Sequence, residues 1–156
     1  MSSAVGARPR GVLTALDYQG PEEQRHAGLR AVRAVRHRTA NALQVAFGWA
    51  QLGEEGKARD CLERMVREEA LLSALGRSGD DAQQHALWQL MADAEEAGQA
   101  LAFRGEPRTV RPGMLRDVVA QLGGAIGERR AGTLVIACGE DGVTVSRAEE
   151  AQDVRR

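Results

Sequence analysis

A histidine lies in the middle of a strongly basic stretch of the chain. Five arginines surround His37: Arg25, Arg30, Arg33, Arg36 and Arg38. No acidic residue occurs between Glu23 and Glu54. The imidazole ring titrates near neutral pH, so its neutral form can act as a nucleophile. Phosphoryl transfer needs little more from a protein than a nucleophile and cations that stabilise the transferred oxygens. The chemistry that fits these residues is acceptance of a phosphoryl group by His37.

One long helix is expected to position this histidine. Pro21, followed by Glu22 and Glu23, is typical of a helix start, and no further proline occurs before Leu52. Successive residues of a helix are about 100° apart around its axis. With this spacing, six polar side chains lie within about 40° of one line along the helix surface: His26, Arg30, Arg33, His37, Asn41 and Gln44. The other side is expected to be buried and carries Val32, Val35, Thr39, Ala42, Ala46 and Ala50. The spacing therefore predicts an exposed polar stripe with His37 at its centre.

Two other interpretations share this pattern. A solvated basic helix face could carry the histidine incidentally, and a basic helix could read a groove of nucleic acid in a DNA-binding dimer. The net charge of -1 gives no bulk attraction to nucleic acid or to anionic membrane. The arginines also surround a histidine and are not gathered on a short recognition helix. We therefore expect no nucleic-acid partner.

A second helix is expected at about 57–75, after a break between Gly53 and Gly56. Two helices joined by so short a link lie antiparallel, as a hairpin. Each has an apolar side, which on the second helix includes Leu62, Met65 and Leu72. A hairpin cannot bury both sides alone, so a second copy is expected to complete a four-helix bundle. The sequence thus predicts a homodimer.

The second half predicts a small α/β unit. Helices are expected at 82–97 and 113–129, and strands at 99–104, 133–138 and 143–146, with Gly139 to Gly142 as a hairpin turn. The expected fold class is α+β. The expected units are a lead-in at 1–20 with a turn of helix near 12–16, the hairpin at 21–78, the α/β unit at 79–147 and a charged tail at 148–156.

Composition narrows the class of protein further. Hydrophobic residues make up 43% and aromatic residues 3%, which favours a core of Leu, Val and Ala. Cys61 and Cys138 have no companions at metal-ligand spacing and are expected to be buried thiols. The longest strongly apolar run, 134–138, is far too short to span a membrane. A cytoplasmic protein that binds no cofactor or metal of its own is expected.

The segment from Val35 to Gln44, followed by Gln51-Leu52-Gly53, resembles the phosphoacceptor helix of a known family. This is the phosphotransferase B family of the sporulation phosphorelay (Spo-zero-B type), related to the citrate- and fumarate-sensing histidine kinases. The family pattern is an apolar residue, Arg, His, Asp, two variable residues, Asn, a variable residue, Leu and Gln. The matching residues here are Arg36, His37, Asn41, Leu43 and Gln44.

The resemblance implies that His37 is the phosphoacceptor of a two-component phosphorelay, in sporulation initiation. The implied partners are response-regulator receiver domains, which would bring Mg²⁺ in their own acidic pockets. The supporting or partner-docking residues are expected to be Arg33, Arg36, Arg38, Asn41 and Gln44. Arg38 departs from the family, which has an acidic residue there that is thought to act as a base during attack on ATP. Its replacement argues against autophosphorylation.

The resemblance also implies that the α/β unit derives from a kinase ATP-binding (GHKL-like) domain. Such a domain needs an asparagine on its nucleotide-binding helix, and Asn41 is the only asparagine in the chain. The expected helix at 113–129 contains Gln121-Leu122-Gly123-Gly124 and cannot supply it. We therefore expect a degenerate domain and a phosphotransferase. The alternatives are a non-catalytic module that binds a receiver or a kinase, and a histidine kinase that still uses ATP.

Overall fold

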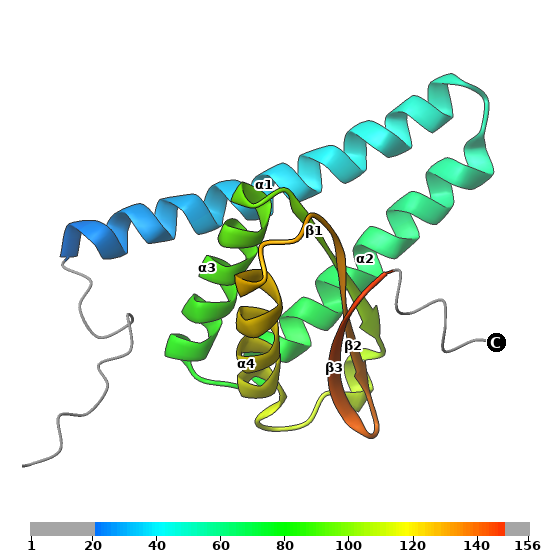
Figure 1. The fold of residues 1–156 in the computed structure, drawn as a ribbon. Helices are drawn as coiled ribbons and strands as arrows, with labels where there is room; N and C mark the ends of the chain where they lie inside the picture. The colour runs from blue at the N-terminus through cyan, green and yellow to red at the C-terminus, as the bar shows by residue number, and fades with distance from the viewer. Residues whose placement is uncertain (1–20, 149–156) are drawn as a thin grey trace, which may run out of the picture.

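The structure, a computed structural model, describes residues 21–148. Its elements follow the predicted order (Figure 1): α1 (Pro21–Gln51), α2 (Glu55–Arg77), α3 (Asp81–Glu96), β1 (Gln99–Gly105), the short 3-10 helix η1 (Pro107–Thr109), α4 (Met114–Gly127), β2 (Gly132–Gly139) and β3 (Gly142–Arg147). Only η1, between two prolines, had no counterpart among the expected elements. The turn of helix expected near 12–16 and the tail from 149 lie outside the described residues.

Helices α1 and α2 form the predicted hairpin. Gly53 adopts a positive φ of 77°, the left-handed conformation that commonly ends a helix. The carbonyl of Trp49 accepts from the backbone N–H groups of Leu52 at 3.1 Å and Glu54 at 2.9 Å, which closes the turn. The tip of the hairpin extends away from the rest of the molecule (Figure 1).

The second half is a three-stranded mixed sheet with two helices. β1 and β2 are parallel and connected through α4, while β2 and β3 are antiparallel and connected by the two residues Glu140 and Asp141. The sheet order is β1-β2-β3, and α3 and α4 lie side by side against it (Figure 1). This is the α-β-α-β-β unit that the sequence predicted.

The hydrophobic core joins the hairpin to the sheet. Fully buried side chains come from four elements: Leu71 and Leu75 of α2, Leu87 of α3, Leu115, Val118 and Leu122 of α4, and Leu134 and Ile136 of β2. The C-terminal half of α2 is therefore packed into the α/β unit. The predicted core of Leu, Val and Ala is confirmed for leucine and alanine, whereas Val118 and Val135 are the only valines among the buried residues of 21–148. The burial of both free thiols, Cys61 and Cys138, is also confirmed.

The link between α2 and α3 fixes two helix starts. The carboxylate of Asp80 accepts from the Gln83 N–H at 2.8 Å, and the Gln83 side chain accepts from the Asp80 N–H at 3.1 Å, which makes a capping box. The Ser78 hydroxyl accepts from the Leu115 N–H at 3.1 Å, at the start of α4. Because Gly113 has no side chain to cap α4, Ser78 supplies that bond from a distant part of the chain.

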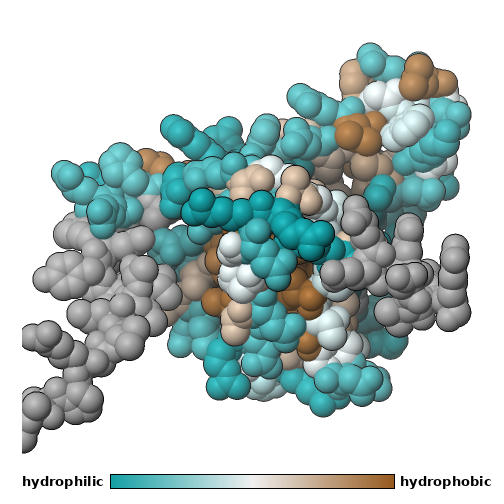
Figure 2. Space-filling view, viewed as in Figure 1, coloured by the Kyte–Doolittle hydropathy of each residue, from teal (hydrophilic) through white to brown (hydrophobic). Residues whose placement is uncertain are grey.

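Apolar side chains remain exposed on the hairpin. The large exposed ones there are Leu29, Val32, Leu43, Val45 and Phe47 of α1, Leu52 in the link between the helices, and Leu62 and Val66 of α2. Figure 2 shows hydrophobic surface near the tip of the hairpin. Val32, Ala50 and Leu62 were expected on buried sides, and the single chain leaves them exposed, because two helices cover only part of each other's circumference. No helix within residues 21–148 is long and apolar enough to cross a membrane.

Candidate functional site

His37 lies near the middle of α1, and 63% of its side chain is exposed. Its Nδ1 atom contacts the carboxylate of Glu95, in the last turn of α3. An imidazole that donates from Nδ1 to a carboxylate keeps its lone pair on Nε2. The ring is thus held by one nitrogen while the other can face an incoming group.

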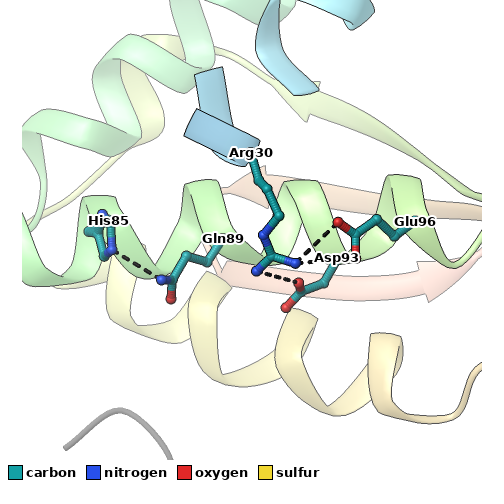
Figure 3. Close-up of polar contacts among 5 residues, drawn as sticks. All are labelled: Arg30, His85, Gln89, Asp93 and Glu96. Atoms are coloured by element: carbon teal, nitrogen blue, oxygen red, sulfur yellow. Dashed lines mark hydrogen bonds and ion pairs between the residues drawn. The ribbon is translucent and has the colours of Figure 1, made fainter. Parts of the chain in front are cut away.

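The last turn of α3 is tied to α1 by a second set of contacts (Figure 3). The guanidinium of Arg30 lies 3.7 Å from the Asp93 carboxylate and donates to both oxygens of Glu96, at 3.1 and 3.2 Å. Arg30 precedes His37 by seven residues, about two turns of helix. These ion pairs hold the end of α3 alongside the predicted stripe.

Arg38 is turned away from this face into the junction of three elements. It forms an ion pair with Glu68 of α2, donates to the Leu101 carbonyl of β1 at 3.0 Å, and stacks over the Phe103 ring at 5.1 Å. Only 21% of its side chain is exposed. Arg38 was expected to support His37 or dock a partner; its guanidinium is engaged in these structural contacts, and the residue also lines a hollow beside His37.

Arg33 and Arg36 remain on the exposed side of α1. Within residues 21–148 no carboxylate pairs with either guanidinium. They line an open hollow of about 420 Å³ together with His37 and Glu95. The hollow therefore brings an imidazole and two guanidinium groups together.

A second hollow, of about 390 Å³, lies on the other flank of His37. Asn41 lines it, and so do Glu95 and the first residues of β1, from Gln99 to Leu101. Gln44, the last predicted docking residue, is exposed further along α1. Asn41 thus accompanies His37 at the site, whereas Gln44 does not line either hollow.

The buried arc of α1 is shifted from the one that helical spacing predicted. Ala34 is buried, at 7% exposure, although it flanks the expected stripe, while Val32, which was expected on the buried side, is half exposed. The reason is that α3 covers the side of α1 that carries Arg30, Ala34 and His37. His37 is consequently at the border between α3 and solvent and not at the centre of an open face.

The roles of two acidic residues, Glu68 and Glu95, were not identified from the sequence. Glu68 was expected to be solvated, yet it pairs with Arg38 and is only 18% exposed. A signal for this pair was present, because Arg38 and Glu68 each stand 15 residues from Gly53 and so oppose each other in the hairpin. Glu95 had no comparable signal, because its contact depends on how α3 crosses α1.

The described residues contain no cluster of three or more His, Cys, Asp or Glu that could hold a metal ion. Comparison with protein-family models, with curated proteins and with solved structures gave no match for the chain.

Proposed function

We propose that the chain is a histidine phosphotransferase of a two-component phosphorelay. His37 attacks the aspartyl phosphate of one response-regulator receiver domain and passes the phosphoryl group to the aspartate of another. The observation that carries this proposal is an exposed imidazole held at Nδ1 by a carboxylate, with the guanidinium groups of Arg33 and Arg36, which pair with no carboxylate of residues 21–148, beside it. These groups supply the nucleophile and the cations that phosphoryl transfer requires.

Electrostatic complementarity supports a receiver domain as the partner. Receiver domains present an acidic pocket that holds Mg²⁺ around the phosphorylated aspartate, and a basic helix would attract that pocket. Arg33 and Arg36 are the arginines that line the hollow beside His37, whereas Arg30 and Arg38 are paired with carboxylates of α3 and α2. Asn41, one helical turn after His37, is placed to donate to the same partner.

Transfer from a receiver fits the residues better than attack on ATP. In the histidine kinases that the His37 segment resembles, the residue after the histidine is acidic. Here it is Arg38, whose guanidinium is engaged in structural contacts. The chain's only asparagine is on α1, so α4 has none with which to hold a nucleotide-bound metal ion. An acyl phosphate is a more activated donor and needs less help from the acceptor protein.

The exposed apolar side chains of the hairpin are proposed to pair with those of a second copy. Leu43, Phe47, Leu62 and Val66 would then lie inside a four-helix bundle. The α/β unit, proposed to be a degenerate kinase-ATPase-like domain, would hold α3 against α1 and serve as a docking element. The proposed role in sporulation rests on the resemblance of the His37 segment, and the proposed cytoplasmic location rests on the composition of the chain.

The test is transfer from a pre-phosphorylated receiver domain, run beside labelled ATP alone. The proposal predicts a phosphoprotein that is acid-labile and base-stable, formed from the receiver and not from ATP. Labelling from ATP alone would favour the kinase alternative. Binding of receivers without any transfer would favour the non-catalytic module.

A further inference from the structure

The last turn of α3 has an unusual charge distribution. It carries Asp93, Glu95 and Glu96 and no basic residue. The C-terminal end of a helix has a partial negative charge, so carboxylates there are unfavourable unless cations meet them. In this chain the partners come from α1: Arg30 pairs with Asp93 and Glu96, and His37 contacts Glu95.

The Arg30 contacts fix where Glu95 must lie. Asp93 and Glu96 flank Glu95 and are both held by one guanidinium (Figure 3). Gly98, at a φ of +68°, then turns the chain from α3 into β1. With the helix end anchored on both sides, the Glu95 carboxylate is presented to the Nδ1 atom of His37.

We infer that Glu95 is a positioning residue for phosphoryl transfer, and this inference rests on the proposed function of His37. The carboxylate accepts the Nδ1–H, which fixes the tautomer and directs the Nε2 lone pair outward. Glu95 thereby brings a carboxylate from α3 to the histidine. The residue next to His37 in the sequence does not supply one, because it is Arg38, which is engaged in structural contacts.

The step is balanced without any further reactant. The Nε2 lone pair forms a bond to the phosphorus of the receiver's aspartyl phosphate, and the acyl P–O bond breaks with its electron pair returning to the receiver's carboxylate. The phosphorylated ring, still carrying its Nδ1–H, becomes positively charged, and the adjacent Glu95 carboxylate stabilises that charge. Transfer to the next receiver reverses these changes and leaves the ring neutral.

Glu95 also lies where it can act during partner approach. Its carboxylate is 42% exposed, and the residue lines both the hollow of Arg33 and Arg36 and the hollow of Asn41. A partner that reaches Nε2 from either hollow would therefore meet a ring whose orientation Glu95 has already set.

The test compares Glu95→Gln and Glu95→Ala in the full-length protein. Glu106→Gln is the control, because it makes the same charge change at an exposed residue beyond the far end of β1. Long-range ¹H–¹⁵N correlation spectra report the tautomer of His37, and a pre-phosphorylated receiver gives the transfer rate. We expect the Nδ1–H tautomer in the wild type and in Glu106→Gln, and its loss in Glu95→Ala. The transfer rate is expected to fall about 10- to 100-fold in Glu95→Ala and less in Glu95→Gln, which keeps an acceptor.

Two results would overturn the inference alone. One is an Nε2–H tautomer in the wild type, and the other is a transfer rate in Glu95→Ala within about twofold of the Glu106→Gln control. Failure of every receiver to phosphorylate the wild-type protein would instead overturn the proposed function, and the role of Glu95 with it.

Discussion

At the scale of single residues, the two neighbours His37 and Arg38 have opposite environments. His37 is 63% exposed at the border of α3, whereas Arg38 is enclosed by α2 and β1. Consecutive helical residues are separated by about 100°, so adjacent side chains can belong to different surfaces. An arginine at position 38 fits this place in the structure, since an acidic residue there would oppose Glu68.

Arg38→Ala is predicted to lower the free energy of unfolding by about 2–3 kcal/mol. The variant loses the bond to the Leu101 carbonyl and leaves the Glu68 carboxylate without its partner in a partly buried place. Chemical denaturation measures the change. Arg36→Ala, on the exposed side of the same helix, is the matched control and is expected to stay within about 0.5 kcal/mol of wild type. Equal effects of the two substitutions would contradict the structural role of Arg38.

The Cys138 thiol is predicted to be inert in the folded protein. Burial raises the pKa of this thiol above its ordinary value of 9.0, and only the thiolate reacts. The unfolded chain loses the thiol proton at a lower pH than the folded protein does. The folding stability that the thiol contributes is therefore present below its ordinary pKa and is lost as the pH rises from there through the raised pKa of the folded state. In Cys61→Ser, whose remaining thiol is Cys138, alkylation by iodoacetamide should stay slow from about pH 7 to 9 and become fast in guanidinium. Rapid alkylation of the folded protein would contradict the burial.

At the scale of elements, local signals predicted most of the secondary structure. Pro21 marks the start of α1, Asp80 caps α3, and Glu140-Asp141 form the turn between β2 and β3. Each of these acts through its immediate neighbours, so it is visible in the sequence. The crossing of α3 over α1 depends on packing between distant segments, and with it the contact of Glu95 with His37. The exposure of His37 on the first helix was therefore predictable, and its contact with Glu95 was not.

Gly105 is predicted to be intolerant of any side chain. Its φ is +138°, and a Cβ there would lie 2.2 Å from the carbonyl oxygen of Cys138 in the neighbouring strand. Gly105→Ala should lower the free energy of unfolding by about 2 kcal/mol or more. Gly124→Ala, at an open helical position of α4, is the control and should raise it by about 0.4–1 kcal/mol. Thermal and denaturant unfolding of both variants would show whether the close strand approach exists.

At the scale of the whole molecule, one chain has a continuous core at one end and an open hairpin at the other. The core ends at Leu71 of α2, and beyond it the apolar side chains of the hairpin tip are covered only by each other. An apolar groove of about 650 Å³ between Ala50, Leu62 and Val66 is part of this uncovered surface. A second copy is the partner proposed to fill it.

The proposed dimer predicts a mass in solution of twice the chain mass of 16.8 kDa. The double substitution Phe47→Glu and Val66→Glu should shift the protein to a monomer, because it would bury charges in the apolar interface. Arg116→Glu, on the exposed face of α4, is the control and should leave the mass unchanged. Sedimentation equilibrium measures all three, and a monomeric wild type at micromolar concentration would contradict the four-helix bundle.

The most direct test of the central claim is the location of the phosphoryl group. The chain has three histidines, His26, His37 and His85, and a phosphorylated receiver domain can be offered to each single Gln variant. We expect the wild type to form an acid-labile phosphoprotein and its yield to fall at least about 100-fold in His37→Gln, since no other side chain replaces His37 as the nucleophile. His85→Gln, on α3, should be labelled like the wild type. A phosphoprotein that survives His37→Gln, or its absence from the wild type with every receiver, would contradict the account.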